Sequence, residues 1–335
     1  MTTIKDVANR AGVAPITVSR VVNNSGYVSS ATRQRVEAAA AELNYVPNML
    51  ARSLRSNRTD TLALVLTDIT NPFWTTVARG AEDSASAHGF SVIFCNTDEH
   101  EAKQDQYLSM LLRKRVDGFL YVPANDRPDP IVQIHKQGIP VVVLDRKIHG
   151  VDVDFVRSDS KDGAAKLISH LLELGHKKIA IFNGPPNIAT ARERLAGFKI
   201  AMTKAGQEFD ESLVFSGEFT VESGRQMVKQ LLQRESLPTA LFAANNFIAI
   251  GAIQALRSNG LRVPEDISLV CFDDIPTSHM IEPFLTVVAQ PAYQIGQRAA
   301  ELLVTHITQS GKQDFQDIVF APELIVRNSC QRVSS

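Results

Sequence analysis

The chain has 335 residues and a formal net charge of −1, with 44% hydrophobic and 21% charged residues. This composition is ordinary for a globular protein, and the length favours two or three domains over one. No apolar run approaches the ~20 residues of a membrane helix, and the first residues lack the apolar core of a secretory signal. The three cysteines, Cys95, Cys271 and Cys330, are odd in number and far apart. We therefore expect reduced thiols in a cytoplasmic protein that makes no membrane contact.

The charges are unevenly distributed along the chain. Residues 1–58 carry eight basic and three acidic residues, a net charge of +5, whereas residues 59–335 carry 27 basic and 33 acidic residues, a net charge of −6. A basic head on an acidic body predicts that the head meets a polyanion. A solvated basic face without a partner explains the charge alone equally well.

Three short helices are predicted in this head. Thr3 can cap the first helix with Asp6 as its capping-box partner, Gly12 supplies a turn, and Pro15 suits the first position of the second helix. A third helix fits residues 30–43. Small apolar side chains recur at helical spacing, at Ile4, Val7, Ala8, Ala11, Val18, Val21, Val22, Val36, Ala39, Ala40 and Leu43. Such an arrangement is typical of a helix-turn-helix module.

The second helix has a polar outer face, formed by Ile16, Thr17, Ser19, Arg20 and Asn23. Hydroxyl and amide groups can bond phosphate oxygens, and Arg20 can reach a guanine edge or a phosphate. Pro15 and Ile16 lie at the helix N-terminus, which such modules press into the major groove. There they could touch a thymine methyl group or exclude other bases by shape. This face favours DNA binding over a helical bundle used for protein contacts.

The stretch after Pro47 is short and mixes leucine with arginine. Residues 48–55 are compatible with a helix, but an isolated helix of this length is marginal in water. Leu54 could enter a base step while Arg52, Arg55 and Arg58 hold phosphates, as in a minor-groove wedge. The stretch by itself also fits a flexible tether.

The body alternates apolar, β-branched runs with helical patterns, in two series that meet near Ser158. Strands are predicted within residues 61–69, 90–96, 116–122, 140–145, 177–184, 238–245 and 266–274. Continuous apolar strands that alternate with helices indicate parallel sheets covered on both faces. Two series indicate two lobes, which bind a ligand in the cleft at the carboxyl ends of their strands.

Polar and aromatic side chains follow these strands. They are Phe73, Trp74, Asp145, Arg146, Arg194, Phe219, Asn245 and Asp273, together with Asp159 at the crossing between the lobes. An aromatic face for a sugar ring, with Arg, Asp and Asn for hydroxyl groups, would form a sugar or polyol site. Any one of these residues alone is more often a capping or packing residue, and it is their shared position that predicts a site.

The residues quoted above also carry a family resemblance. "TIKDVANRAGVAPITVSRVVNN", "NPFW", "KRVDGFL", "LGHKKIAIFNGP", "RERLAGF", "GLRVPEDISLVCFDD" and "PFLTVVAQP" resemble the LacI/GalR (lactose-repressor) family of bacterial transcription regulators. The resemblance runs from Thr3 to about Arg327. It implies a small all-α helix-turn-helix DNA-binding head and an α/β two-lobe core like that of periplasmic binding proteins, with parallel sheets.

The resemblance implies these domain boundaries: a head at residues 1–46, a hinge helix and linker at 47–60, and an effector-binding and dimerisation core at 61–330. Lobe 1 of the core would comprise about residues 61–160 and 291–321, and lobe 2 about residues 161–290 and 322–330.

The resemblance also implies a repressor of transcription. A homodimer would bind a near-palindromic double-stranded DNA operator, and a small molecule, a sugar or sugar derivative, would control its affinity. The expected DNA contacts are Thr3, Pro15, Ile16, Thr17, Ser19, Arg20, Asn23, Tyr27, Tyr45, Asn48, Ala51, Leu54 and Arg55. The expected effector contacts are Phe73, Trp74, Arg146, Asp159, Arg194, Phe219, Asn245 and Asp273. The alternative is a cytoplasmic sugar-binding protein without a DNA role.

Other chemistry is not indicated. The sequence has no nucleotide-binding glycine motif, no Cys/His spacing typical of zinc and no nucleophile elbow, so we expect no cofactor, no metal and no enzyme activity.

One position departs from the family pattern. Asn245-Asn246 stands where the family usually has Asn-Asp, which removes a carboxylate from the end of that strand.

Overall fold

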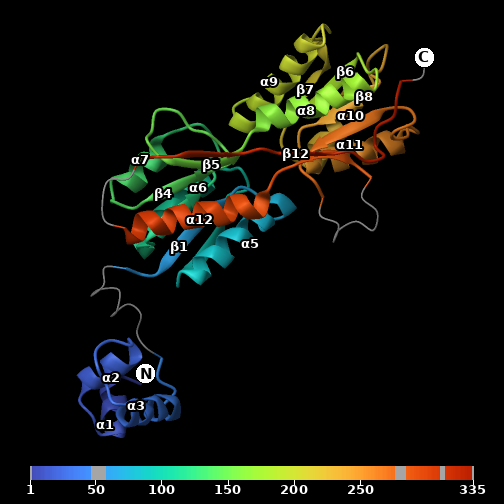
Figure 1. Cartoon of the computed structure of the whole chain (residues 1–335). Helices are drawn as coiled ribbons and strands as arrows, with labels where there is room; N and C mark the ends of the chain where they lie inside the picture. The colour runs from blue at the N-terminus through green and yellow to red at the C-terminus, as the bar shows by residue number, and fades with distance from the viewer. Residues whose placement is uncertain (1, 47–57, 276–283, 310–313, 334–335) are drawn as a thin grey trace. The chain divides into compact units, whose positions relative to one another are not determined.

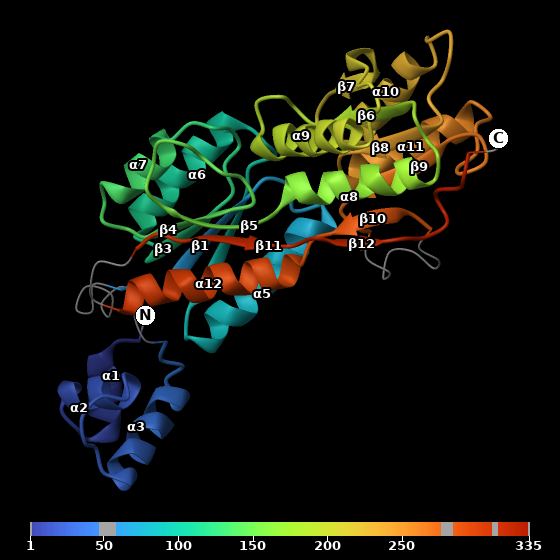
Figure 2. The same cartoon turned by 45° about the horizontal axis from the view of Figure 1, so that its top comes forward.

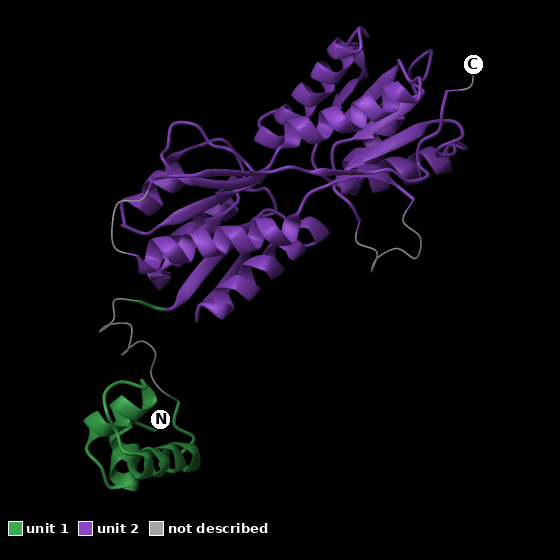
Figure 3. Cartoon of the chain, in the orientation of Figure 1, with its two compact units in different colours: residues 1–59 green, residues 60–335 purple. Residues whose placement is uncertain are grey.

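The computed structural model describes residues 2–46, 58–275, 284–309 and 314–333. The chain forms two compact units, residues 1–59 and 60–335 (Figure 3). The predicted hinge helix at residues 48–55 lies outside the described residues.

The first unit contains three helices, α1 (Ile4–Ala11), α2 (Pro15–Val22) and α3 (Ser30–Glu42). The predicted capping box is confirmed: the Thr3 backbone N–H donates to Asp6 Oδ2 at 2.8 Å, and the Thr3 hydroxyl accepts from the Asp6 backbone N–H. Gly12 ends α1 with a φ of 65°, a left-handed conformation that glycine adopts without strain. The core of this unit is small and consists of Val7, Ala8, Ala11, Val18, Val21, Val36 and Ala39.

The second unit contains two six-stranded sheets. The first sheet has the order β11-β5-β4-β3-β1-β2 and comprises β1 (Thr61–Leu66), β2 (Ser91–Asn96), β3 (Gly118–Tyr121), β4 (Val141–Leu144), β5 (Asp154–Ser158) and β11 (Asp317–Phe320). The second has the order β12-β10-β9-β8-β6-β7 and comprises β6 (Ile179–Asn183), β7 (Val214–Ser216), β8 (Ala240–Ala243), β9 (Ser268–Phe272), β10 (Thr286–Ala289) and β12 (Glu323–Ile325).

Two features of these sheets differ from the sequence-based expectation. The edge strand β12 runs antiparallel to β10, so the second sheet is mixed and not purely parallel. Strands β5, β7, β10, β11 and β12 lie outside the predicted ranges. Strands β7 and β12 have three residues each, and β11 is half exposed at a sheet edge, so they lack the continuous apolar run that marks a buried strand.

Helices cover both faces of each sheet (Figure 1). The first sheet is covered by α5 (Pro72–Ala87) and α12 (Ala292–Thr308) on one face and by α6 (Glu101–Lys114) and α7 (Asp129–His135) on the other. The second is covered by α10 (Val221–Leu231) and α11 (Asn246–Ser258) on one face and by α8 (Ser160–Glu173) and α9 (Ala189–Lys204) on the other. A single-turn 3-10 helix spans Glu211–Leu213.

Helices α5 and α12 approach each other at two glycines. A Cβ atom on Gly296 would lie 1.9 Å from the Val77 carbonyl oxygen, and one on Gly80 would lie 2.1 Å from the Tyr293 carbonyl oxygen. No side chain fits at those distances, so glycine permits the close packing that ties the late helix α12 to the first sheet.

The first sheet with its helices is called lobe 1, and the second sheet with its helices is called lobe 2. The chain passes between the lobes three times, from β5 to α8, from β10 to α12 and from β11 to β12 (Figures 1 and 2). In the part of the chain that the structure describes, no helix is both long enough and apolar enough to cross a bilayer.

Candidate functional site

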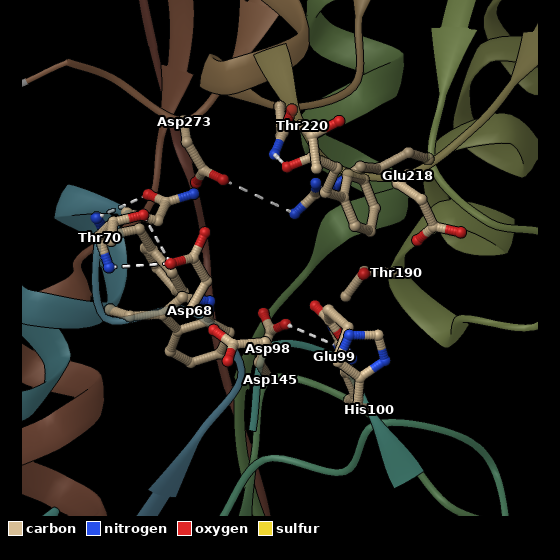
Figure 4. A pocket seen from close by; sticks show the side chains of 17 residues that line it. Asp68, Thr70, Asp98, Glu99, His100, Asp145, Thr190, Glu218, Thr220 and Asp273 are labelled. Carbon is tan, nitrogen blue, oxygen red and sulfur yellow. Dashed lines mark hydrogen bonds and ion pairs between the residues drawn. The ribbon is translucent and has the colours of Figure 1, made fainter. Parts of the chain in front are cut away.

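A cavity of about 530 Å³ lies between the lobes of the second unit (Figure 4). Its walls come from segments that follow β1, β2, β4, β6, β7, β8 and β9, so the carboxyl ends of strands from both sheets meet around it. The lining residues are Asp68, Thr70, Asn71, Phe73, Trp74, Asp98, Glu99, His100, Asp145, Arg146, Thr190, Arg194, Glu218, Phe219, Thr220, Asn245 and Asp273.

Arg146 is held in a fixed position on the lobe 1 wall. Its two terminal nitrogens donate to the two carboxylate oxygens of Glu99, at 2.6 and 2.5 Å, and one of them also donates to the Pro123 carbonyl oxygen at 2.8 Å. A bidentate pair of this kind is strong and directional. Burial raises the pKa of the neighbouring Asp145, although Arg194 and Arg146 act in the opposite direction. Arg146 is therefore a structural part of the wall with its charge already balanced.

Asp273 and Arg194 face each other on the lobe 2 wall. Asp273 Oδ1 accepts a hydrogen bond from Gln290 at 2.6 Å, and its Oδ2 lies 3.9 Å from an Arg194 nitrogen. Arg194 donates at 2.6 Å to the Ala244 carbonyl oxygen and stacks 3.8 Å from the centre of the Phe272 ring. Burial raises the pKa of Asp273 to about 6, against the opposing effects of Arg194 and Gln290.

Four of the lining carboxylates stand on backbone in the left-handed region. The φ angles are 53° at Asp98, 60° at Glu99, 63° at Asp145 and 70° at Asp273. Non-glycine residues with such angles cost free energy and persist where the surroundings hold them. Because all four lie around one cavity, we interpret this backbone strain as fixing the carboxylates for the function of the cavity.

Aromatic rings lie on both walls. Phe73 and Trp74 pack edge to face with ring centres 4.7 Å apart at the start of α5. Phe219 lies on lobe 2 directly over Gly184, where a Cβ atom would come within 2.1 Å of the ring. The cavity therefore combines apolar ring faces with polar groups, as sites for sugar rings do.

Asn245 and Asn246 have separate roles. Asn245 caps α11 by accepting from the Ile248 N–H at 2.8 Å, and it also lines the cavity. Asn246 is buried and exchanges two hydrogen bonds with Asn71 of lobe 1, at 3.0 and 3.1 Å. A carboxylate at position 246 could accept but not donate, so the amide that departs from the family pattern completes a reciprocal pair between the lobes.

Seven of the eight predicted effector contacts line this cavity: Phe73, Trp74, Arg146, Arg194, Phe219, Asn245 and Asp273. The eighth, Asp159, is not among the lining residues, and its carboxylate caps α8 by accepting from the Asp162 N–H at 2.9 Å. A strand-end aspartate that precedes a helix is an N-cap first, and the spacing to Asp162 was the available signal.

Several lining residues were missed by sequence reasoning. They are Asp68, Thr70, Asn71, Asp98, Glu99, His100, Thr190, Glu218 and Thr220. Asp98, Glu99 and His100 follow β2 directly, so the strand-end rule could have found them. Thr190 lies in the first turn of α9, and Glu218 lies in the short connection between β7 and α10, where no strand was predicted.

The predicted DNA-contact residues of the first unit lie on and around α2. Ile16 is 55% exposed and Tyr27 is 90% exposed, and Pro15, Arg20 and Asn23 are also exposed. Within the described part of the chain, Arg20 makes no ion pair. A protruding cation at this position is available to a DNA base or phosphate.

Three of the remaining predicted contacts are less exposed, whereas Thr3 is exposed. Thr17, Ser19 and Tyr45 are half-buried, and Tyr45 packs against the helical core. The Thr3 side chain is engaged with Asp6. Asn48, Ala51, Leu54 and Arg55 lie outside the described residues.

Comparison with known protein families gives two matches. Residues 3–48 match "Bacterial regulatory proteins, lacI family", and residues 59–319 match "Periplasmic binding proteins and sugar binding domain of LacI family". The two matches correspond to the two compact units.

Individual proteins match over almost the whole chain. The HTH-type transcriptional repressor PurR of Haemophilus influenzae (strain PittEE) is 38% identical over 99% of this chain and 100% of its own length. A structure of the transcriptional regulator CelR in complex with cellobiose is 35% identical, with a TM-score of 0.74 over 98% of this chain and 100% of that one. The Lac repressor dimer bound to operator and the anti-inducer ONPF is 29% identical, with a TM-score of 0.86 over 98% and 99%.

Proposed function

The chain belongs to the LacI family of bacterial regulatory proteins and is a DNA-binding transcription regulator, and we propose how its two units carry out repression. The α2 face of the first unit reads the operator, and the cavity between the lobes binds the effector that controls operator affinity. The observation that carries the proposal is the cavity lined from both lobes by aromatic rings and fixed polar groups. A ligand that touches both lobes can change how they sit together.

The proposed effector is a sugar or a sugar derivative. Trp74 and Phe219 offer ring faces on opposite walls, and the carboxylates and guanidinium groups suit hydroxyl groups. The matching CelR structure holds cellobiose, which is a property of that protein and supports the same class for this cavity.

The proposed assembly is a homodimer that pairs through its cores. Strand β2 is an edge of the first sheet, and Phe94 on it is 41% exposed. Ile69, whose N–H donates to Asn96 Oδ1 at 3.0 Å, is 42% exposed beside the same strand. An edge strand with exposed apolar side chains needs a cover, and a second copy would provide it. A symmetric dimer predicts an operator that is close to palindromic.

The proposed coupling runs through residues 48–55. Two such segments would become helical together on the operator, with Leu54 wedged into the minor groove and Asn48, Ala51 and Arg55 beside it. Unstacking a base step costs a few kcal/mol, so the free-energy balance of the bound state is small. An effector that binds one arrangement of the lobes more tightly can then change operator affinity.

The alternative, a cytoplasmic sugar-binding protein without a DNA role, leaves the basic helix-turn-helix unit without a use. The proposed role is non-enzymatic, needs no cofactor or metal, and places the protein in the cytoplasm with its DNA.

A two-step experiment tests this function. A thermal-shift screen of sugars, sugar acids, polyols and nucleosides identifies ligands, and an operator-binding assay then measures affinity with and without each hit. We expect a hit that changes operator affinity at least ~10-fold, since allosteric couplings are typically 1–3 kcal/mol. A hit that stabilises the protein but leaves operator affinity unchanged contradicts effector control.

A further inference from the structure

The cavity between the lobes carries a large excess of negative charge. Six carboxylates line it: Asp68, Asp98, Glu99, Asp145, Glu218 and Asp273. The two basic groups that line it are Arg146 and Arg194, so the lining has a formal charge of −4 with His100 counted as neutral. A cleft lined by one sign of charge concentrates its field and repels ligands of the same sign.

The two guanidinium groups are partly engaged by the protein. Arg146 makes its bidentate pair with Glu99, and Arg194 donates to the Ala244 carbonyl oxygen beside Asp273. Both side chains are only 5% exposed. Arg146 cannot bind a phosphate or a carboxylate through its terminal nitrogens without giving up Glu99. The Nε of Arg194 has no hydrogen-bond partner among the described residues, but its neighbouring terminal nitrogen lies 3.9 Å from Asp273, so an anion bound there would also meet the Asp273 carboxylate.

The carboxylates, in contrast, keep acceptor capacity. Asp68 uses Oδ1 for both the N–H and the hydroxyl of Thr70, at 2.8 and 2.6 Å, and its Oδ2 is not used in those bonds. The Oδ2 atom of Asp273 lies 3.9 Å from an Arg194 nitrogen, which is too long for a hydrogen bond. Glu218 is exposed at the cavity wall, and within the described residues it makes no ion pair. Such oxygens accept strong hydrogen bonds from hydroxyl groups.

We infer that the cavity selects an uncharged, hydroxyl-rich effector and rejects the phosphorylated or carboxylated form of the same molecule. The inference rests on the proposed function and narrows its ligand class. An anionic group in this cavity would lose its hydration and meet an excess of like charge, so its binding is opposed by both desolvation and repulsion. A neutral polyol loses less hydration and donates to every carboxylate that it reaches.

The test compares matched pairs of ligands by isothermal titration calorimetry with the full chain. The uncharged arm contains D-ribose, D-glucose, D-galactose, D-mannose, D-fructose, cellobiose and sorbitol. The anionic arm contains their phosphate esters and their aldonic or uronic acids. We expect at least one uncharged ligand to bind, with its anionic counterparts at least ~10-fold weaker, because ~1.4 kcal/mol of repulsion suffices for that ratio. The ratio of the two dissociation constants, anionic over uncharged, should decrease at higher salt, because salt screens the carboxylates nearest to solvent.

Charge-neutral variants test the cause. Glu218→Gln and Asp68→Asn each remove one lining charge with little change in shape, and each should narrow the ratio by ~2- to 5-fold. Glu235→Gln is the matched control, because Glu235 is exposed outside the cavity lining, and its ratio should equal that of the wild type.

The outcomes separate this inference from the proposed function. A phosphorylated or acidic ligand that binds as tightly as its uncharged partner, and that alters operator affinity, overturns the inference while effector control stands. If the ratio of anionic to uncharged dissociation constants is unchanged in both Glu218→Gln and Asp68→Asn, repulsion by the lining carboxylates is not the cause of the selectivity. If no ligand of either arm binds, the sugar effector and this inference fall together.

Discussion

Asn71 and Asn246 connect the two lobes through a reciprocal pair of amide hydrogen bonds of 3.0 and 3.1 Å, across 175 positions of sequence. Both side chains are buried, and each also stands at a helix start, Asn71 as the cap of α5 and Asn246 as the first residue of α11. Any relative movement of the lobes at this point must break or rebuild the pair. We therefore expect it to bias the equilibrium between lobe arrangements.

The variant Asn246→Ala tests this role. It leaves the buried Asn71 amide without its partner, which costs ~1–3 kcal/mol in the arrangement described here. We expect a lower free energy of unfolding and a shift of at least ~5-fold in the effector concentration that half-saturates the operator response. Asn259→Ala is the control, since that amide bonds only within its own helix end, to the Ala255 carbonyl oxygen. Equal dose responses in the two variants would show that the pair does not couple the lobes.

The pH dependence of stability should report Asp273. Its pKa is about 6 in the folded protein, above the ~3.9 of an unfolded aspartate, so the folded state binds the proton more tightly. The stabilisation of the folded state that comes from proton binding at Asp273 is fully present below about pH 4 and is lost as the pH rises through 6. Asp273→Asn keeps a neutral group that tolerates the left-handed backbone, and it should gain ~1–3 kcal/mol of unfolding free energy at pH 7.5 but little at pH 4.

Urea denaturation at pH 4, 5, 6 and 7.5 measures this difference. The same variant should lose the effector response, because an amide replaces a carboxylate acceptor in the cavity. Asp314→Asn, an exposed aspartate outside the cavity, is the control and should follow the wild type at every pH. A gain in stability that does not vary with pH would mean that Asp273 is not the titrating group.

Arg20 should contribute to operator recognition. Arg20→Ala is expected to weaken operator binding by ~1–3 kcal/mol if the guanidinium reads a base, and to reduce the preference for operator over random DNA. If Arg20 contacts only phosphate, binding to both DNAs should fall together, with a shallower salt dependence. Arg79→Ala, in an exposed pair with Asp83 on α5, controls for the lost charge. If Arg20→Ala binds the operator as tightly as Arg79→Ala does, Arg20 does not contribute to operator recognition.

The edge strand β2 should form part of the dimer interface. Phe94→Glu places a charge on the exposed apolar edge, where burying it against a second copy would be costly. Light scattering should show the wild type as a dimer and the variant as a monomer at the same concentration. Val132→Glu, an exposed apolar position on α7, should remain dimeric. A tetrameric wild type would contradict the expected homodimer.

The features that the sequence alone predicted depend on contacts between near neighbours in the chain. The capping box of Thr3 and Asp6 spans three residues, and Gly12 ends the same helix. The long apolar strands of the two series were equally visible, because a parallel sheet covered on both faces requires continuous apolar runs. The strand-end rule then located Trp74 and Asp273 at the cavity, since parallel strands bring their carboxyl ends to one edge.

Other features were decided only by the tertiary structure. Asp159 and Asp273 were both expected to contact the effector, yet one caps a helix and the other is buried beside Arg194 with a raised pKa. The pairing of Asn71 with Asn246 has no local signal either. Burial, and with it the charge balance of the cavity, is set by segments far apart in the chain. These segments come into contact only when the three lobe crossings bring the two sheets together. A pattern of neighbouring residues cannot predict contacts of this kind.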